Sequence, residues 1–391
     1  MLGGTPVRAS VLPYGQQCIE DDDIAAVVEA LRSEWLTTGP RVAQFESEFA
    51  ARVNAQHAVA VCNGTAALHA AMYALGIGPG DEVIVPSLTF AASANCVLYQ
   101  GARPVFADVD AKTLLLDPQS VEDRITPRTR AIIAVDYAGQ PCRYGDLQDI
   151  ASRNGLAIVA DAAHAVGASF QGRRVGSIAD LTTFSFHPVK QITTGEGGVI
   201  TTSDAELARK MRAFRNHGIS SDARERSSRG AFFYEMTDLG FNYRITDVQC
   251  ALGMSQLRKL DRFIATRQAI AAIYDSAIEL LPAARRLAVF PDVVHAYHLY
   301  PILLESERLS ADRGVIFKAL RAEGIGVNVH YIPVHLHPYY VQRLGTHPGI
   351  SPVAERAYER LITIPLHANM TSEDASDVVA ALEKVLNHFA H

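Results

Sequence analysis

The chain has 391 residues, of which 48% are hydrophobic and 20% are charged, and it carries a net charge of −6. This length allows two or three domain-sized units with a large core, and the composition is ordinary for a soluble globular enzyme. The acidic balance argues against a nucleic-acid or anionic-membrane surface, because phosphate groups are held by clustered Lys and Arg. We find no secretory signal and no apolar stretch long enough to cross a bilayer.

The five cysteines are scattered along the chain, with no Cys-x-x-Cys pair. They fit reduced thiols, and they favour neither a disulfide framework nor a zinc site. We therefore expect a cytoplasmic enzyme without a metal centre.

Short apolar strands dominate the first half of the chain. The first dozen residues are typical of an extended arm, and the acidic run 20–23 opens a helical pattern that continues to about Ser33. A second helical pattern carries Phe45 and Phe49. Strands that are buried on both faces and joined by helices predict an α/β fold with a mainly parallel, doubly wound sheet. The predicted strands are 58–62, 82–86, 104–108, 131–137, 157–161, 181–186 and 198–202.

The pattern changes after about residue 205. A long helical region covers 246–280, and Pro282 ends it. The remainder predicts alternating elements, namely a strand at 298–304, a helix at 312–322, a strand at 326–331 and a last helix at 372–389. We therefore predict a large domain over residues 1–260, which includes the arm, and a smaller α+β C-terminal domain over residues 261–391.

One lysine and one aspartate stand out chemically. Lys190 lies on a polar turn between two predicted strands, where burial lowers the pKa of an amine and frees its lone pair for Schiff-base chemistry. Asp161 ends an earlier apolar strand and would keep a pyridinium nitrogen protonated. Together they predict a pyridoxal-phosphate site. The alternatives are an ordinary surface lysine and, for Asp161, a buried cap or a metal ligand.

Two further segments could hold the phosphate of such a cofactor. Gly64, Thr65 and Ala66 lie between a strand and a helix start, where backbone N–H groups bind anions. The alternative for this segment is a simple helix cap. Ser185 offers a hydroxyl from the strand before Lys190, although a lone strand serine is usually structural.

Two ring side chains lie near the same predicted strand ends. Phe90 could place its ring on a flat cofactor, or it could be a core aromatic. His164 could hydrogen-bond the 3-oxygen of the cofactor ring, or it could satisfy a polar pocket.

Motifs along nearly the whole chain resemble those of the DegT/DnrJ/EryC1/StrS family of sugar aminotransferases. This family is a branch of the fold-type I, aspartate-aminotransferase-like, pyridoxal-phosphate-dependent enzymes. The resemblance therefore implies that fold and a transaminase activity. The matching motifs are residues 36–39, 63–68, 80–86, 89–91, 104–108, 161–164, 185–190, 195–198, 216–218, 240–246 and 330–333.

The family resemblance also implies roles for individual residues. Lys190 would bind pyridoxal phosphate covalently, and the cofactor would alternate with its pyridoxamine form during the cycle. Asp161 would pair with the pyridine nitrogen. His164 would lie beside the ring hydroxyl, and Phe90 would stack on the ring. The phosphate would be held by Gly64, Thr65, Ala66 and Ser185, joined by Asn242 from the neighbouring subunit. The resemblance therefore implies a homodimer with shared active sites.

Within the family, residues 135–139, 185–198 and 329–331 most resemble the UDP-4-amino-4,6-dideoxy-N-acetyl-β-L-altrosamine transaminases of pseudaminic acid biosynthesis. That likeness implies L-glutamate as amino donor and a UDP-linked 4-keto-6-deoxy sugar as acceptor. Related perosamine and 4-amino-4-deoxyarabinose enzymes share much of the pattern. The implied sugar-nucleotide pocket consists of Tyr14, Glu34, Trp35, Leu36, Thr37, Gly64, Val329, His330, Tyr331 and Ile332.

Three other functions are weighed against this one. A 3-dehydratase of the same fold carries histidine at the position of Lys190, so that lysine argues against it. An amino-acid-directed enzyme of the same fold is disfavoured by the sugar-family motifs. A non-catalytic cofactor-binding regulator would need a DNA-binding segment or a degraded site, and neither is visible.

A basic loop is the last candidate. The segment 218–235 is rich in Ser and Arg and has no period. Arg224, Arg226 and Arg229 in this loop, or Arg244 beyond it, could meet the pyrophosphate of a sugar nucleotide. The alternative is a solvated run of charge.

Overall fold

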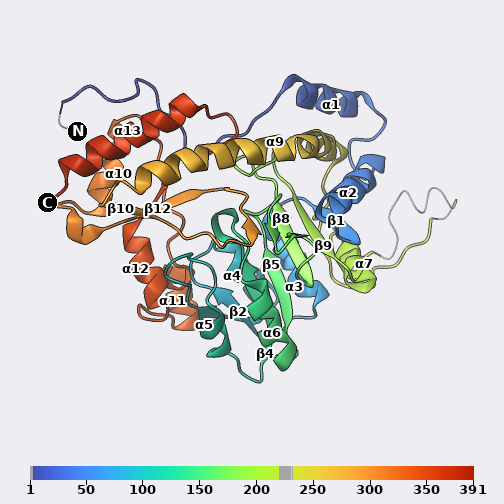
Figure 1. Cartoon of the computed structure of the whole chain (residues 1–391). Coiled ribbons are helices and arrows are strands. Elements are labelled where there is room, and N and C mark those ends of the chain that lie inside the picture. Colours follow the sequence, from blue (N-terminus) through green and yellow to red (C-terminus); the bar gives the residue numbers. More distant parts are fainter. Residues whose placement is uncertain (1–2, 220–229, 231) are drawn as a thin grey trace.

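The computed structural model describes residues 3–219, 230 and 232–391, and its centre is a seven-stranded sheet (Figure 1). Neighbouring strands follow the order β1-β9-β8-β5-β4-β2-β3. β9 pairs antiparallel with both of its neighbours, whereas the other ladders are parallel. The predicted α/β fold with a mostly parallel sheet is confirmed. The strands are β1 (His57–Val61), β2 (Glu82–Pro86), β3 (Arg103–Ala107), β4 (Thr129–Val135), β5 (Ala157–Asp161), β8 (Leu181–Ser185) and β9 (Gly198–Thr202).

Helices cover both faces of this sheet, because successive side chains of a strand point to opposite sides. Along β4, Ile132 packs into one buried cluster and Ile133 into another. Residues of α2, α6 and α9 complete the first cluster, and residues of α3, α4 and α7 complete the second. Because both faces of the sheet are buried, the sequences of its strands are continuous apolar runs. The covering helices are α2 (Pro40–Val53), α3 (Gly64–Ala74), α4 (Ala92–Tyr99), α6 (Tyr144–Asn154), α7 (Ala205–Phe214) and α9 (Asp247–Ile278).

Helix α9 connects the large sheet to the C-terminal region (Figure 1). Its 32 residues begin with a capping box, in which the side chains of Thr246 and Gln249 satisfy each other's backbone N–H groups. Its first half contributes Leu260 to the core beside the large sheet, and its second half contributes Tyr274 to a separate C-terminal core. The predicted domain boundary between residues 260 and 261 therefore falls within one continuous helix.

The C-terminal region is built on a second, three-stranded sheet of order β10-β12-β13. Its two ladders are antiparallel, and it packs with helices α10 and α13 into the C-terminal core. These elements are β10 (Ala284–Arg286), β12 (Tyr300–Leu304), β13 (Leu361–Ile364), α10 (Arg313–Ala322) and α13 (Ser372–His388).

Among the described residues, the short elements are α5 (Pro118–Glu122), α11 (Pro338–Leu344), α12 (Pro352–Arg360), the 3-10 turns at Tyr137–Gly139, Ser306–Arg308 and Val334–Leu336, and a small sheet of β6 (Ser169–Phe170), β7 (Arg173–Arg174) and β11 (Val293–Val294).

The strand predicted at 326–331 is wrong. Only Asn328 in this segment pairs with β13, through two backbone hydrogen bonds to Thr363 of 3.0 and 2.7 Å. Gly326 instead donates its backbone N–H to Leu12 of the N-terminal arm at 2.8 Å. Because the segment divides its hydrogen bonds between the arm and β13, it forms no ladder, and β13, which was not predicted, completes the small sheet.

The N-terminal arm crosses the C-terminal region before helix α1 (Asp21–Arg32) begins (Figure 1). Arg8 forms ion pairs with Asp374 and Asp377 of α13 at 2.8 and 2.6 Å. Leu12 forms a parallel bridge with Ile325. These contacts therefore attach the N-terminal arm to the C-terminal region.

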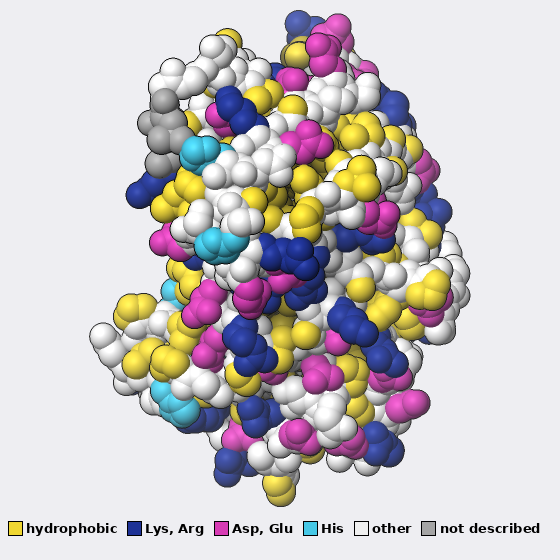
Figure 2. All heavy atoms as spheres, turned by 60° about the vertical axis from the view of Figure 1, so that its left-hand side comes forward, with side chains coloured by type: hydrophobic (Ala, Val, Ile, Leu, Met, Phe, Trp, Pro, Cys, Tyr) yellow, Lys and Arg dark blue, Asp and Glu magenta, His cyan; other side chains and the backbone are white. Residues whose placement is uncertain are grey.

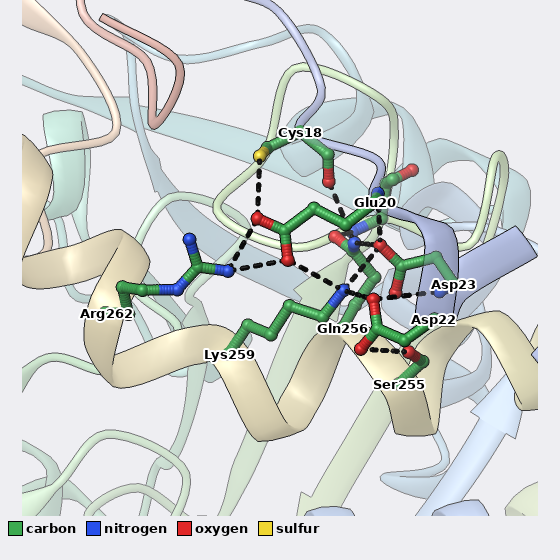
Figure 3. A network of polar contacts seen from close by, with 9 residues as sticks. Cys18, Glu20, Asp22, Asp23, Ser255, Gln256, Lys259 and Arg262 are labelled. Atoms are coloured by element: carbon green, nitrogen blue, oxygen red, sulfur yellow. Dashed lines mark hydrogen bonds and ion pairs between the residues drawn. The ribbon is translucent and has the colours of Figure 1, made fainter. Parts of the chain in front are cut away.

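Helix α1 is fixed to α9 by a cluster of acids around one lysine (Figure 3). Lys259 of α9 is 8% exposed, and its ammonium group forms ion pairs with Asp23 at 2.7 Å, with Glu20 at 3.2 Å and with Asp22. Arg262, one turn along α9, holds the other side of Glu20 at 2.7 Å. This cluster fixes the helix that leads directly into the segment 34–37.

On the face shown in Figure 2, basic and acidic side chains lie interspersed among apolar ones. None of the helices in the described residues is both long enough and apolar enough to span a membrane.

Candidate active site

The candidate residues gather at the carboxyl ends of the parallel strands. Asp161 is the last residue of β5, Ser185 is the last residue of β8, and Lys190 follows five residues later in the chain. Ligands of open α/β sheets bind at this edge, because the loops that leave the strands form a crevice there.

Asp161 presents a buried carboxylate that is already partly hydrogen-bonded. The side chain is 6% exposed, and it accepts hydrogen bonds from Ser93 Oγ at 2.6 Å and from the backbone N–H of Ala163 at 3.2 Å. Burial raises the pKa of Asp161, while these two donors and the charge of Lys190 act in the opposite direction. An ionised carboxylate in this position suits a protonated pyridine nitrogen.

Lys190 has the environment of a reactive amine. Burial lowers its pKa to about 8, with a further contribution from the charge of Arg267, while Asp161 acts to raise it. Its Nζ lies 3.4 Å from Nε2 of His298. The amine therefore loses its proton within reach of neutral pH, as a nucleophile or general base must.

His164 is a neutral, buried imidazole. Its Nε2 lies 3.0 Å from the hydroxyl of Tyr331, and its Nδ1 has no hydrogen-bond partner within the described residues. Burial holds its pKa well below the usual range, and the charge of Lys190 lowers it further. The contact with Tyr331 links this ring to the predicted sugar pocket.

The start of α3, where the sequence predicts a phosphate site, lies next to Ser185. Asn63 caps the helix by accepting a hydrogen bond from the N–H of Ala66 at 2.8 Å. A Cβ atom on Gly64 would lie 2.8 Å from the Cβ of Ser185, so only glycine lets the helix start approach that hydroxyl. The N–H groups at the start of a helix that the cap does not satisfy have no intrahelical acceptor, and together with the Ser185 hydroxyl they fit a phosphate.

Aromatic residues join the predicted cofactor and sugar sites. Phe90 is 59% exposed, and its ring centroid lies 5.9 Å from that of Tyr331. The ring of Tyr14 lies 5.3 Å from that of His330, whose Nδ1 is 2.9 Å from the hydroxyl of Thr363. The structure thus brings the residues at 330 and 331 together with Tyr14, Phe90 and His164. Val329 is half-buried, and Ile332 is 43% exposed.

Other predicted residues lie apart from this group. The segment 34–37, which contains Glu34, Trp35, Leu36 and Thr37, is exposed. It lies beside the start of α9, where Leu36 accepts a hydrogen bond from the N–H of Asp247 at 3.0 Å. In the part of the chain that the structure describes, no hydrogen bond joins these four residues to Asp161, His164 or Lys190.

Asn242 is exposed, and it forms an isolated bridge with Asn216 beyond the sheet edge. Arg244 donates a hydrogen bond to Asn216 Oδ1 at 2.8 Å. Arg224, Arg226 and Arg229 lie outside the described residues.

Sequence reasoning missed Ser93, Arg267 and His298. Ser93 is four residues after Thr89, to which its hydroxyl is hydrogen-bonded at 2.8 Å, so helical spacing from the 89–91 motif was an available signal. His298 and Arg267 come from distant segments, and no local pattern relates them to Lys190.

These features fit pyridoxal phosphate. The buried carboxylate of Asp161 suits the pyridine nitrogen, the glycine-dependent cradle at α3 suits the phosphate, and Lys190 supplies the amine.

The chain matches the DegT/DnrJ/EryC1/StrS aminotransferase family over residues 17–383 and belongs to it. Among curated relatives, the spore coat polysaccharide biosynthesis protein SpsC of Bacillus subtilis (strain 168) is 43% identical over 381 residues, which cover 97% of this chain and 98% of SpsC. The protein is thus a sugar aminotransferase.

Solved structures of sugar aminotransferases are also similar to this chain over nearly its whole length. One of them is Helicobacter pylori PseC, an aminotransferase involved in pseudaminic acid biosynthesis. It superimposes on this chain with a TM-score of 0.91 at 32% sequence identity, and the match covers 97% of this chain and 100% of the PseC chain. The PLP-form of the putative sugar aminotransferase Spr1654 from Streptococcus pneumoniae gives a TM-score of 0.90 at 31% identity, with 97% and 99% coverage. The fold is therefore that of the fold-type I transaminases, and the cofactor is pyridoxal phosphate.

Proposed function

We propose that the enzyme transfers the amino group of L-glutamate to C4 of a UDP-linked 4-keto-6-deoxy sugar, as in pseudaminic acid biosynthesis. The observation that carries this proposal is the contact between Tyr331 and His164, because it joins the predicted sugar pocket to the predicted cofactor site. The similarity to PseC over 97% of the chain supports the choice of sugar.

Each catalytic residue has a defined task in this proposal. When bound, pyridoxal phosphate supplies an electron sink for the carbanion formed next to the transferred nitrogen. Lys190 removes the α-proton of glutamate and delivers it during amine transfer, and it moves the proton in the reverse direction at C4 of the sugar. Asp161 keeps the pyridine nitrogen protonated, and His164 hydrogen-bonds the ring oxygen. Phe90 covers one face of the ring.

The phosphate of the cofactor is assigned to the start of α3 and to the end of β8. We assign it to Gly64, Thr65, Ala66 and Ser185, because the short distance between Gly64 and Ser185 creates one compact cradle.

The sugar nucleotide is assigned to the aromatic residues beside this group. Tyr14, His330 and Tyr331 form one aromatic surface, and Val329 and Ile332 flank it. The exposed residues Glu34, Trp35, Leu36 and Thr37, together with Gly64, complete the assigned pocket.

A homodimer completes the site in this proposal, with Asn242 of each subunit reaching the phosphate of the other. Large apolar side chains lie exposed in the segment just before Asn242, which favours burial against a second copy. They are Phe232 (90% exposed), Phe233 (68%), Met236 (66%), Leu239 (72%) and Phe241 (40%). We place the enzyme in the cytoplasm, because its five cysteines are free thiols.

A second sugar is favoured by the 43% identity to SpsC, which acts in spore coat polysaccharide biosynthesis. The alternative acceptor for this chain is a related nucleotide sugar, of the perosamine or 4-amino-4-deoxyarabinose type.

One experiment tests both sugars. Purified enzyme is incubated with L-glutamate and a panel of 4-keto sugars linked to UDP, dTDP or GDP, and the formation of 2-oxoglutarate and of amino sugar is measured. The UDP-linked 4-keto-6-deoxy sugar should give the highest kcat/KM. A higher value for a GDP- or dTDP-linked sugar would contradict the proposed carrier. A cofactor absorbance that glutamate leaves unchanged would point to a non-catalytic binder.

A further inference from the structure

A buried histidine that no motif singles out touches the candidate catalytic lysine. His298 lies just before β12, is 4% exposed, and places Nε2 3.4 Å from Lys190 Nζ. Its ring centroid lies 4.4 Å from that of His164. Its Nδ1 has no hydrogen-bond partner within the described residues, so the contact to Lys190 is the polar contact that the structure gives this ring.

The backbone of His298 is held in place by an arginine from α9. Arg267 is 1% exposed, and it donates hydrogen bonds to the carbonyl oxygens of Tyr297 at 3.2 Å, His298 at 3.3 Å and Leu366 at 2.8 Å. These acceptors tie the middle of α9 to the entry of β12 and to the segment after β13. The position of the imidazole is therefore set by the packing of the small sheet against α9.

We infer that His298 is a positioning residue for Lys190, whose amine donates a hydrogen bond to the neutral imidazole. This inference rests on the role of Lys190 in the proposed function. An ammonium group carries three N–H bonds and no lone pair, so Nε2 can only accept from it. When the ammonium loses one proton, the acceptor retains one N–H and fixes the rotation about the Cε–Nζ bond. The lone pair then lies in one of the two staggered positions that point away from His298.

The surrounding charges support this assignment. Burial holds the pKa of His298 well below its usual range, and the nearby positive charges lower it further, so the ring stays neutral and can accept. The titratable and charged groups whose fields reach Lys190 or His298 come from three segments of the chain, and they are Asp161, His164, Arg267 and His330. Asp161 is the one acid among these four.

The test compares two substitutions of similar size. His298→Gln keeps a side-chain acceptor, whereas His298→Met removes it. In the cofactor-free protein, the pH dependence of Lys190 acetylation by acetic anhydride is read by mass spectrometry of the peptide that contains Lys190. Loss of the acceptor disfavours the charged amine, so His298→Met should shift this curve to lower pH by about one unit, while His298→Gln should stay close to the wild type.

In the loaded enzyme, His298→Met should lower kcat about tenfold with KM changed less than about twofold, and higher pH should not restore kcat. His298→Gln should recover most of the loss. His295→Gln is the control, because His295 is also buried but bonds the N–H of Tyr297 at 2.8 Å instead of Lys190.

The inference is overturned if the acetylation curves of His298→Met and the wild type coincide, or if Gln and Met variants that remain folded by circular dichroism lose kcat equally. The acetylation readout needs no sugar substrate. It therefore remains decisive even if the sugar panel rejects the proposed acceptor.

Discussion

Two lysines, one in the candidate site and one between α1 and α9, show how neighbours decide what burial does to an amine. Burial alone lowers the pKa of both. Around Lys259, hydrogen bonds to Asp22, Asp23 and Glu20 outweigh burial and raise its pKa. Around Lys190, the attraction of Asp161 is too weak to do so, and its pKa falls to about 8. Lys259 is therefore a structural cation, whereas Lys190 has the lowered pKa that a reactive base needs.

The largest expected effect concerns the base itself. Lys190→Ala should reduce transamination by at least about 10³-fold, because it removes both the covalent attachment and the proton carrier. The visible absorbance of lysine-bound cofactor should also disappear, and steady-state assays with absorbance scans measure both. Retention of full activity in this variant would overturn the assignment. Lys259→Met is the matched control, and it should retain the absorbance.

The reactivity of the two amines sharpens the comparison further. At pH 7 the neutral fraction of an amine with a pKa of about 8 exceeds that of an ordinary lysine by roughly two orders of magnitude. In cofactor-free protein, acetylation of Lys190 should therefore rise with pH and level off above pH 8. Labelling of Lys259 should still be rising there, because its pKa is raised. If the acetylation of the two lysines had the same pH dependence, the inferred difference between their pKa values would be contradicted.

Stability should show the opposite order. Lys259→Met leaves three carboxylates without their shared cation, and we expect the free energy of unfolding to fall by about 2 kcal/mol. Cofactor-free Lys190→Met should be at least as stable as the wild type at pH 7, because it removes a charge that burial disfavours. Urea unfolding measures both.

Lys384→Met provides the surface control. Lys384 pairs with Glu323 at 2.7 Å, but its side chain is 44% exposed, so we expect a loss of less than about 1 kcal/mol. If Lys259→Met and Lys384→Met lowered the free energy of unfolding equally, burial of the α1–α9 cluster would contribute nothing to stability.

A smaller effect on kcat than that of Lys190→Ala concerns Asp161, the acid whose charge acts on Lys190. Ser93→Ala removes a 2.6 Å hydrogen bond that lowers the pKa of Asp161. The carboxylate should then take up a proton at higher pH, so the acidic limb of the kcat profile should move upward, and kcat at neutral pH should fall about tenfold. Ser87→Ala is the control, because the buried hydroxyl of Ser87 has no partner within the described residues. Identical pH profiles for the two variants would contradict a role for Ser93.

Local sequence patterns determined much of this protein. The strands of the large sheet were predictable because burial on both faces leaves uninterrupted apolar runs, as in β4 and β5. Asp161, Ser185 and Lys190 could be proposed as a group, because parallel strands end at one edge of a sheet. Lys190 and Asp161 predicted the cofactor, the family resemblance added the class of reaction, and the comparisons confirm both.

Only the tertiary structure decided the rest. The segment 326–331 has a strand-like composition, yet competition between Leu12 and Thr363 for its backbone groups prevents a ladder. His298 is 108 residues from Lys190 in the chain, and the two meet because the small sheet packs against the middle of α9. Sequence spacing encodes contacts within one helix or strand, whereas contacts between distant segments depend on how whole elements pack. For that reason Lys190 and Asp161 could be found in the sequence, but the neighbours His298 and Arg267 could not.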